Sequence, residues 1–178
     1  AVYCSDVSGA FDKVSGSRLV DKLKKKRFDP DIIKVIASWL QPRRAVVIVG
    51  GGRSEPFNIK NMIYQGTVLG PMLWNLFFED AASAIQEYLV EASVYADDLN
   101  AYREFPSSTP NEIALRSIDN VQSELHKWGD ANQVTFDSSK ESKHVLSRTD
   151  PAGNLFKLLG VQFDCQLFMA EAVRTLTC

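Results

Sequence analysis

Two adjacent aspartates, Asp97 and Asp98, lie between two short apolar runs, and this arrangement is the strongest constraint on the fold. Residues 93–102 read SVYADDLNAY, with β-favouring side chains before and after the acidic pair. The pattern predicts a β-hairpin with the carboxylates at or beside its turn. Neighbouring side chains of a strand point to opposite faces, so consecutive aspartates can act together only where the backbone bends.

Two negative charges beside apolar strands are unfavourable unless a cation or a strong donor compensates them. A divalent metal ion is the obvious candidate. The alternative is an ordinary solvated turn, because Asp-Asp pairs also occur in such turns. The pair alone does not decide between the two interpretations.

The composition is that of a globular protein with one core. The chain has 178 residues, of which 45% are hydrophobic and 24% charged, and this balance excludes overall disorder. No apolar run approaches the ~20 residues that span a bilayer, and no signal peptide opens the chain. We therefore expect an intracellular protein, cytoplasmic or nuclear, without membrane contact.

The first residues and the formal charge bear on how complete the chain is. It starts without Met in a strand-like run, so we expect a fragment. The formal net charge of −2 argues against this piece holding a long nucleic acid alone. The three cysteines, Cys4, Cys165 and Cys178, lack metal-like spacing and are expected to be buried or incidental thiols.

Helical periodicity and turn signals predict four helices. The first covers residues 17–28 and ends in a basic cluster, and the second starts at Asp29-Pro30. The third runs from Met72 to about residue 89, and the fourth from Thr109 to about Trp128, with Gly129 ending it. We expect strands at residues 1–6, 45–49, 57–63, 134–136, 144–146 and 155–163. His126 and His144 are interpreted as structural or solvated.

Two loops are further candidates for binding a ligand. Ser8 and Gly9 suit a tight turn after Asp6, although Asp6 could simply cap a helix. The loop from Gln65 to Pro71 leads into a helix whose N-terminus could meet an anionic substrate, or it is a plain connection. The glycines at 50–52 favour a flexible hairpin loop over a phosphate cradle.

The order of these motifs resembles a known family. Asp6 and Phe11 are followed by a Gln-Gly-x-x-x-Gly-Pro loop at 65–71, Tyr-Ala-Asp-Asp at 95–98, Asn-x4-Asp-x2-Lys at 132–140 and Leu-Gly at 159–160. Together they resemble motifs A to E of reverse transcriptases, most closely those of non-LTR (LINE-type) retrotransposons. The resemblance covers nearly the whole chain.

The resemblance implies an α+β fold, the palm of a right-hand polymerase, with a small antiparallel sheet and helices packed on one face. Residues 1–178 would form one palm fragment without a second domain, and the fingers and thumb would be largely missing. Tyr64 stands where many relatives have Pro, and Glu141 replaces a frequent Thr.

The resemblance also assigns roles to individual residues. Asp6, Asp97 and Asp98 would bind two Mg²⁺ ions, with Mn²⁺ possible, and Lys140 would protonate the leaving pyrophosphate unless it is merely a solvated lysine. The predicted substrate-binding residues are Val7, Ser8, Gly9, Ala10, Phe11, Gln65 and Gly66. Phe11 would select deoxyribonucleotides by crowding the sugar 2′ position. Leu159 and Gly160 would form the primer grip.

The function implied is RNA-directed DNA polymerase, with an RNA template, a DNA primer and dNTPs as partners, inside a larger retroelement polyprotein that could include an endonuclease. The fragment alone is expected to have little activity. One alternative is an RNA-dependent RNA polymerase, which Phe11 disfavours. The other is a domesticated, inactive palm that serves as an RNA-binding scaffold, which the retained acidic residues disfavour.

Overall fold

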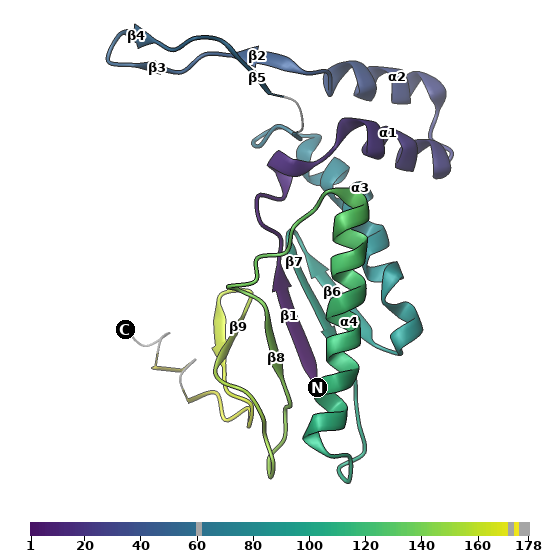
Figure 1. The fold of residues 1–178 in the computed structure, drawn as a ribbon, viewed down its shortest axis with the longest axis vertical. Helices are drawn as coiled ribbons and strands as arrows, with labels where there is room; N and C mark the ends of the chain where they lie inside the picture. The colour runs from purple at the N-terminus through teal and green to yellow at the C-terminus, as the bar shows by residue number, and fades with distance from the viewer. Residues whose placement is uncertain (60–61, 171–172, 175–178) are drawn as a thin grey trace. The chain divides into compact units, whose positions relative to one another are not determined.

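A computed structural model describes residues 1–59, 62–170 and 173–174, and the chain divides into two compact units (Figure 1). The first unit comprises Ala1–Ser8, Asp80–Ala131 and Thr135–Cys178, and the second comprises Gly9–Glu79 and Asn132–Val134. Cys178 and residues 60–61 of the predicted strand 57–63 lie outside the described residues. That the chain forms one domain stays a prediction.

The first unit is built on a four-stranded antiparallel sheet. Its strands are β6 (Glu91–Tyr95), β7 (Asp98–Tyr102), β1 (Val2–Asp6) and β8 (Ser142–His144), and they are hydrogen-bonded in that order. Asp6 pairs with Asp98, and Cys4 pairs with both Asn100 and Ser142. Because directly opposite side chains share a face, these five residues lie on one side of the sheet.

The other side of the sheet packs against the long helix α4 (Asn111–Asn132) (Figure 1). Tyr3, Leu99 and Ala101 on this side have no exposed surface. Lys143 on β8 donates to Gln122 of α4 at 3.1 Å. Without α4 this apolar face of the sheet would be exposed to water, so the helix is needed to bury it.

Helix α4 extends past its predicted end at Gly129. Gly129 is buried inside the helix, which continues to Asn132. A glycine destabilises a helix interior by about 1 kcal/mol relative to alanine. Gly129 lies on the buried side of α4, where tertiary packing outweighs this low helix propensity. The residue after the helix, Gln133, has φ 62 and supplies the left-handed end that the sequence predicts at Gly129.

A second hairpin lies on the open side of the sheet. Its strands are β9 (Phe156–Leu158) and β10 (Val161–Phe163), where the sequence suggested one strand-like run over 155–163. The run is broken because Leu159 and Gly160 have φ 47 and 84, the positive values that a two-residue hairpin turn requires. Phe156 packs with Val2, Cys4 and Cys165 in a buried cluster.

The second unit contains helices and a two-stranded ribbon. The helices are η1 (Phe11–Lys13), α1 (Gly16–Lys25), α2 (Pro30–Trp39) and the part of α3 (Gly70–Ala84) that ends at Glu79. Helix α2 begins at Pro30, as the Asp29-Pro30 pair predicts, and Asp29 caps it, its Oδ1 accepting from the Asp31 N–H at 2.8 Å. The third predicted helix ends earlier than expected, at Ala84, and a short 3₁₀ turn, η2 (Gln86–Tyr88), follows in the first unit.

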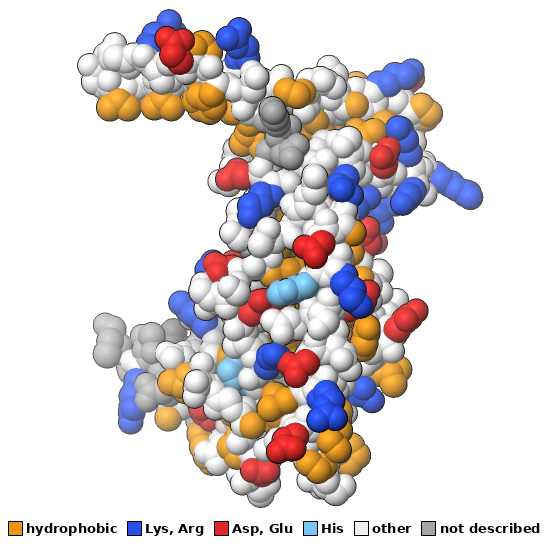
Figure 2. All heavy atoms as spheres, viewed as in Figure 1, with side chains coloured by type: hydrophobic (Ala, Val, Ile, Leu, Met, Phe, Trp, Pro, Cys, Tyr) orange, Lys and Arg blue, Asp and Glu red, His pale blue; other side chains and the backbone are white. Residues whose placement is uncertain are grey.

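The ribbon is formed by β2 (Arg43–Ala45) with β5 (Phe57–Ile59) and by β3 (Ile48–Val49) with β4 (Gly52–Arg53). It confirms the predicted hairpin with a glycine loop. Figure 2 shows hydrophobic side chains along one edge of this ribbon, and Ile48 and Val49 are 60% and 76% exposed. None of the helices within the described residues is long and apolar enough to cross a membrane.

Charge is distributed unequally between the units. The second unit carries twelve Lys and Arg against six Asp and Glu, a formal charge of +6, and the first carries eight against sixteen, a charge of −8. The overall value of −2 therefore averages over a basic and an acidic unit. Net charge is for this reason a poor guide to nucleic-acid contact in this chain.

Gly153 provides a test of the packing beneath the second hairpin. Its φ is +110°, and an added Cβ would lie 2.5 Å from Nδ1 of the buried His144. We expect Gly153→Ala to lower the free energy of unfolding by about 2–4 kcal/mol, from overpacking and backbone strain together. Urea unfolding measures the change. Gly52→Ala, which has an ordinary φ, is the control, and equal midpoints for both variants would refute the assigned packing.

Candidate active site

A cleft of about 250 Å³ in the first unit brings several predicted site residues together. It lies on the open side of the sheet, next to the β9–β10 turn. The residues that line it are Cys4, Ser5, Asp6, Asp98, Asn100, Lys140, Ser142, Lys157, Leu158, Leu159 and Gly160. The predicted metal ligands Asp6 and Asp98 thus share one cleft with Lys140 and with the predicted primer-grip residues.

The acidic residues meet because of strand register. Asp6 at the end of β1 is directly opposite Asp98 at the start of β7, so their side chains share a face. Asp97 lies in the turn before Asp98, and its carbonyl accepts a hydrogen bond from the Val7 N–H at 3.2 Å. Ala96 has φ 53, which confirms the predicted bend at the Asp-Asp pair.

Lys140 contacts this acidic group directly. Its Nζ lies 2.6 Å from Oδ2 of Asp6 and 4.0 Å from Oδ2 of Asp137. The Asp137 N–H in turn donates to the Asp6 carbonyl at 2.9 Å. The hydrogen bond and negative charge of Asp6 raise the pKa of Lys140, so the amine is a cation at neutral pH and pairs with the Asp6 carboxylate.

The carboxylates repel one another. Burial, followed by the charges of Asp6 and Asp97, raises the pKa of Asp98. Asp137 differs, because hydrogen bonds from the Ser139 side chain and backbone lower its pKa. An added cation would therefore offset the negative charge around Asp98.

The donor set fits a hard divalent cation held partly by its substrate. In the described part of the chain, no group of three or more His, Cys, Asp or Glu side chains converges as a complete metal site. Mg²⁺ commonly takes only one or two carboxylates and fills its other positions with water and substrate phosphates. Asp6 and Asp98, with Asp97 beside them, offer such a partial set of oxygen donors.

The predicted nucleotide-binding residues fall in both units. Val7 and Ser8 belong to the first unit, where the Ser8 N–H donates to the Thr135 carbonyl at 2.9 Å. Gly9, with φ 65, and the buried Ala10 belong to the second unit.

Phe11 and Gln65 also lie in the second unit. The Phe11 ring stacks on Trp74 at 5.7 Å, and Gln65 donates to Asp12 at 3.4 Å. Gly66 follows with φ 78, consistent with the predicted turn. The roles of these residues stay predictions.

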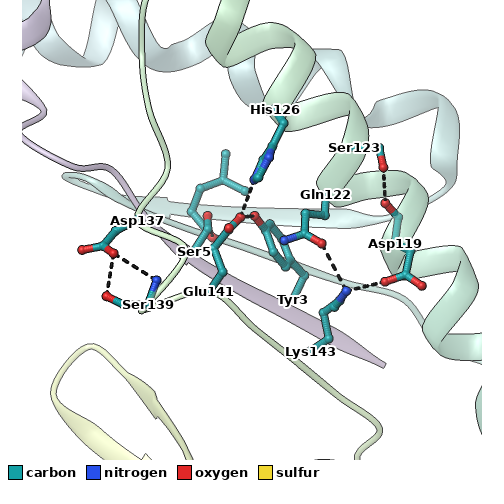
Figure 3. A network of polar contacts seen from close by, with 11 residues as sticks. Tyr3, Ser5, Asp119, Gln122, Ser123, His126, Asp137, Ser139, Glu141 and Lys143 are labelled. Atoms are coloured by element: carbon teal, nitrogen blue, oxygen red, sulfur yellow. Dashed lines mark hydrogen bonds and ion pairs between the residues drawn. The ribbon is translucent and has the colours of Figure 1, made fainter.

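Sequence reasoning missed several residues at or near the cleft. Asn100, Ser142 and Lys157 line it, and the alternation of strand residues could have indicated the first two. A second group lies on the opposite side of the sheet (Figure 3), where Glu141 accepts hydrogen bonds from Tyr3 and His126. No sequence signal joins residues so far apart in the chain.

The comparison with protein families identifies the fold and its relatives. The model for reverse transcriptase (RNA-dependent DNA polymerase) matches residues 1–163. The chain belongs to this family. The predicted resemblance is thus confirmed, and reverse transcriptases generally use divalent metal ions.

Curated relatives are polymerases of mobile elements. The chain is 35% identical over 183 residues to the RNA-directed DNA polymerase from mobile element jockey of Drosophila melanogaster, covering 94% of this chain and 20% of the relative. It is 30% identical over 135 residues to the probable RNA-directed DNA polymerase from transposon BS of the same species, covering 71% of this chain and 14% of the relative. The chain therefore spans a fifth or less of these relatives, which confirm the predicted likeness to non-LTR elements.

A solved structure shares the fold. Apo telomerase from Candida tropicalis, truncated from its C-terminal domain, aligns with a TM-score of 0.56 and 15% identity, over 94% of this chain and 34% of that one. Together with the small antiparallel sheet and its helices, this likeness confirms the predicted α+β polymerase palm.

The repulsion at Asp98 has a measurable consequence. Because its pKa in the folded state is raised, the charged form opposes folding at neutral pH, and the wild-type chain regains stability as pH falls through that pKa. We expect Asp98→Asn to stabilise the metal-free chain at pH 7 by about 0.2–1 kcal/mol and to lose this advantage below about pH 4. Thermal melts in EDTA across pH test this, with Asp119→Asn as the control. A destabilised Asp98→Asn at pH 7 would contradict it.

Proposed function

We propose that this chain is the catalytic palm of an RNA-directed DNA polymerase that adds deoxyribonucleotides to a primer 3′ end. The observation that supports it most is the shared cleft, in which Asp6 and Asp98 face each other and Lys140 touches Asp6 at 2.6 Å. Asp6, Asp97 and Asp98 would hold two Mg²⁺ ions, with Mn²⁺ as a substitute. The bound ions would neutralise charge on the attacking and leaving oxygens of an in-line displacement.

The chain's own residues position the reactants and move one proton. Lys140, protonated beside Asp6, would donate from Nζ to the leaving pyrophosphate. Val7, Ser8, Gly9, Ala10 and Phe11 would line the triphosphate. Gln65 and Gly66 would pack against the incoming nucleotide and the template base.

Leu159 and Gly160 line the cleft from the β9–β10 turn, which suits a grip on the primer end. The partners are then an RNA template, a DNA primer, dNTPs and the remainder of a retroelement polypeptide. Such a protein would act inside the cell, in the cytoplasm or the nucleus.

Primer extension tests the proposal directly. In the polypeptide that carries this chain, an RNA template should support extension with dNTPs and not with rNTPs. We expect Asp97→Ala to reduce extension on the order of a thousandfold, the scale for losing a main electrostatic stabiliser of the transition state. Asp21→Ala, an exposed carboxylate of α1, is the matched control. Extension with rNTPs would instead indicate an RNA polymerase and a wrong interpretation of Phe11.

Metal binding separates a polymerase from a scaffold without requiring activity. A ligand that binds only the folded state raises its stability, so Mg²⁺ or Mn²⁺ should raise the melting temperature of the 178-residue chain. Asp97→Ala and Asp6→Ala should abolish the increase, whereas Asp119→Ala should keep it. No metal-linked increase in the wild-type chain would favour an inactive RNA-binding scaffold.

A further inference from the structure

Glu141 is a buried carboxylate next in sequence to the lysine of the cleft. Its side chain is 5% exposed, whereas that of Lys140 is 59% exposed. Side chains alternate along this segment: Lys140 and Ser142 line the cleft, and Glu141 and Lys143 face α4 on the other side of the sheet. One backbone segment therefore connects the cleft to the helix side of the sheet.

Side chains of β1 and α4 hold the Glu141 carboxylate (Figure 3). The Tyr3 hydroxyl on β1 donates to Oε1, and His126 Nε2 on α4 lies 2.7 Å from the same oxygen. The His126 ring stacks on Phe136, with an angle of 3° between the planes, so it is itself fixed. Burial raises the pKa of Glu141, but hydrogen bonds from Tyr3, His126 and Gln122 outweigh it and hold the pKa below its usual value. The carboxylate is thus ionised and is held by these hydrogen bonds.

Backbone hydrogen bonds connect Glu141 to Asp6 at the cleft. The Lys140 and Glu141 N–H groups donate to the Asp137 carbonyl at 2.9 and 3.1 Å, and the Asp137 N–H donates to the Asp6 carbonyl at 2.9 Å. The turn from Asp137 to Glu141 is therefore tied to β1 at one end and to α4 at the other. If the turn were free, its backbone as well as the lysine side chain would sample many conformations. These hydrogen bonds fix the backbone, so the base of the Lys140 side chain has one position.

We propose that Glu141 is a positioning residue: held by Tyr3 and His126, it fixes the 137–141 turn so that the Lys140 amine stays against Asp6. The inference rests on the proposed roles of Lys140 and Asp6 in polymerisation. Glu141 touches neither substrate nor metal ligand, and it acts through the backbone of its neighbour.

Hydrogen exchange of the 178-residue chain tests the positioning role without any activity. In Glu141→Ala, the amides of Asp137 and Lys140 should exchange about tenfold faster, the scale for losing a charged hydrogen bond, while amides of β1 and β7 that pair with each other stay within about twofold. Glu141→Gln should restore most of the protection, because its amide oxygen can still accept from both Tyr3 and His126. Tyr3→Phe should have an intermediate effect.

Two controls distinguish positioning from general stability. Glu124→Ala removes a carboxylate of α4 that pairs with Lys127, and it should leave the turn protected. Ile118→Val, a conservative core change in α4, should lower the melting temperature without selective exchange at the turn. Uniformly faster exchange in Glu141→Ala, or unchanged exchange at Asp137 and Lys140, would overturn the proposal.

Kinetics add a readout that a purely structural role would not change. In a polypeptide that extends primers, Glu141→Ala should lower kcat for dNTP addition about tenfold and leave KM within about twofold, and Glu141→Gln should recover most of kcat. A raised KM with unchanged kcat in Glu141→Ala, or an equal loss of kcat in both variants, would contradict positioning of Lys140. If the wild-type polypeptide extends no primer, the proposed function fails, and the exchange data still decide the role of Glu141.

Discussion

The repulsion among Asp6, Asp97 and Asp98 is the constraint on which the rest of the first unit depends. Strand register places Asp6 opposite Asp98, and burial, followed by the charges of Asp6 and Asp97, raises the pKa of Asp98. Folding tolerates this cost because the surrounding sheet is fixed by burial of Tyr3, Leu99 and Ala101 against α4. The result is a rigid group of oxygen donors that favours cations.

The two sides of the sheet have different roles. The helix side supplies stability through apolar burial and the Tyr3–Glu141–His126 contacts, and the open side supplies the cleft. Strand β8 is at the edge of the sheet, where pairing on one side only makes a strand easier to displace. Lys143 and Glu141, both tied to α4, secure this edge, and so they secure the turn that presents Lys140.

The second unit differs in character, with a charge of +6 against −8 for the first. Acidic residues suit a site for metal ions, and basic residues suit phosphates. The two kinds of charge are thus concentrated in different parts of the chain. The formal charge of the whole chain conceals this division, because opposite charges cancel in the sum.

The sequence by itself determined the family, the hairpin at Asp97 and Asp98, and the helix starting at Asp29-Pro30, because these depend on local patterns of side chains and turns. Only the tertiary structure decided that Gly129 lies inside a helix, that residues 155–163 fold back at Leu159 and Gly160, and that His126 and Tyr3 meet at Glu141. The first and third depend on burial or on contacts between residues far apart in the chain, and the second depends on positive φ values at Leu159 and Gly160 that a strand-like run does not reveal. Local propensity is worth about 1 kcal/mol or less per residue, and packing overrides it.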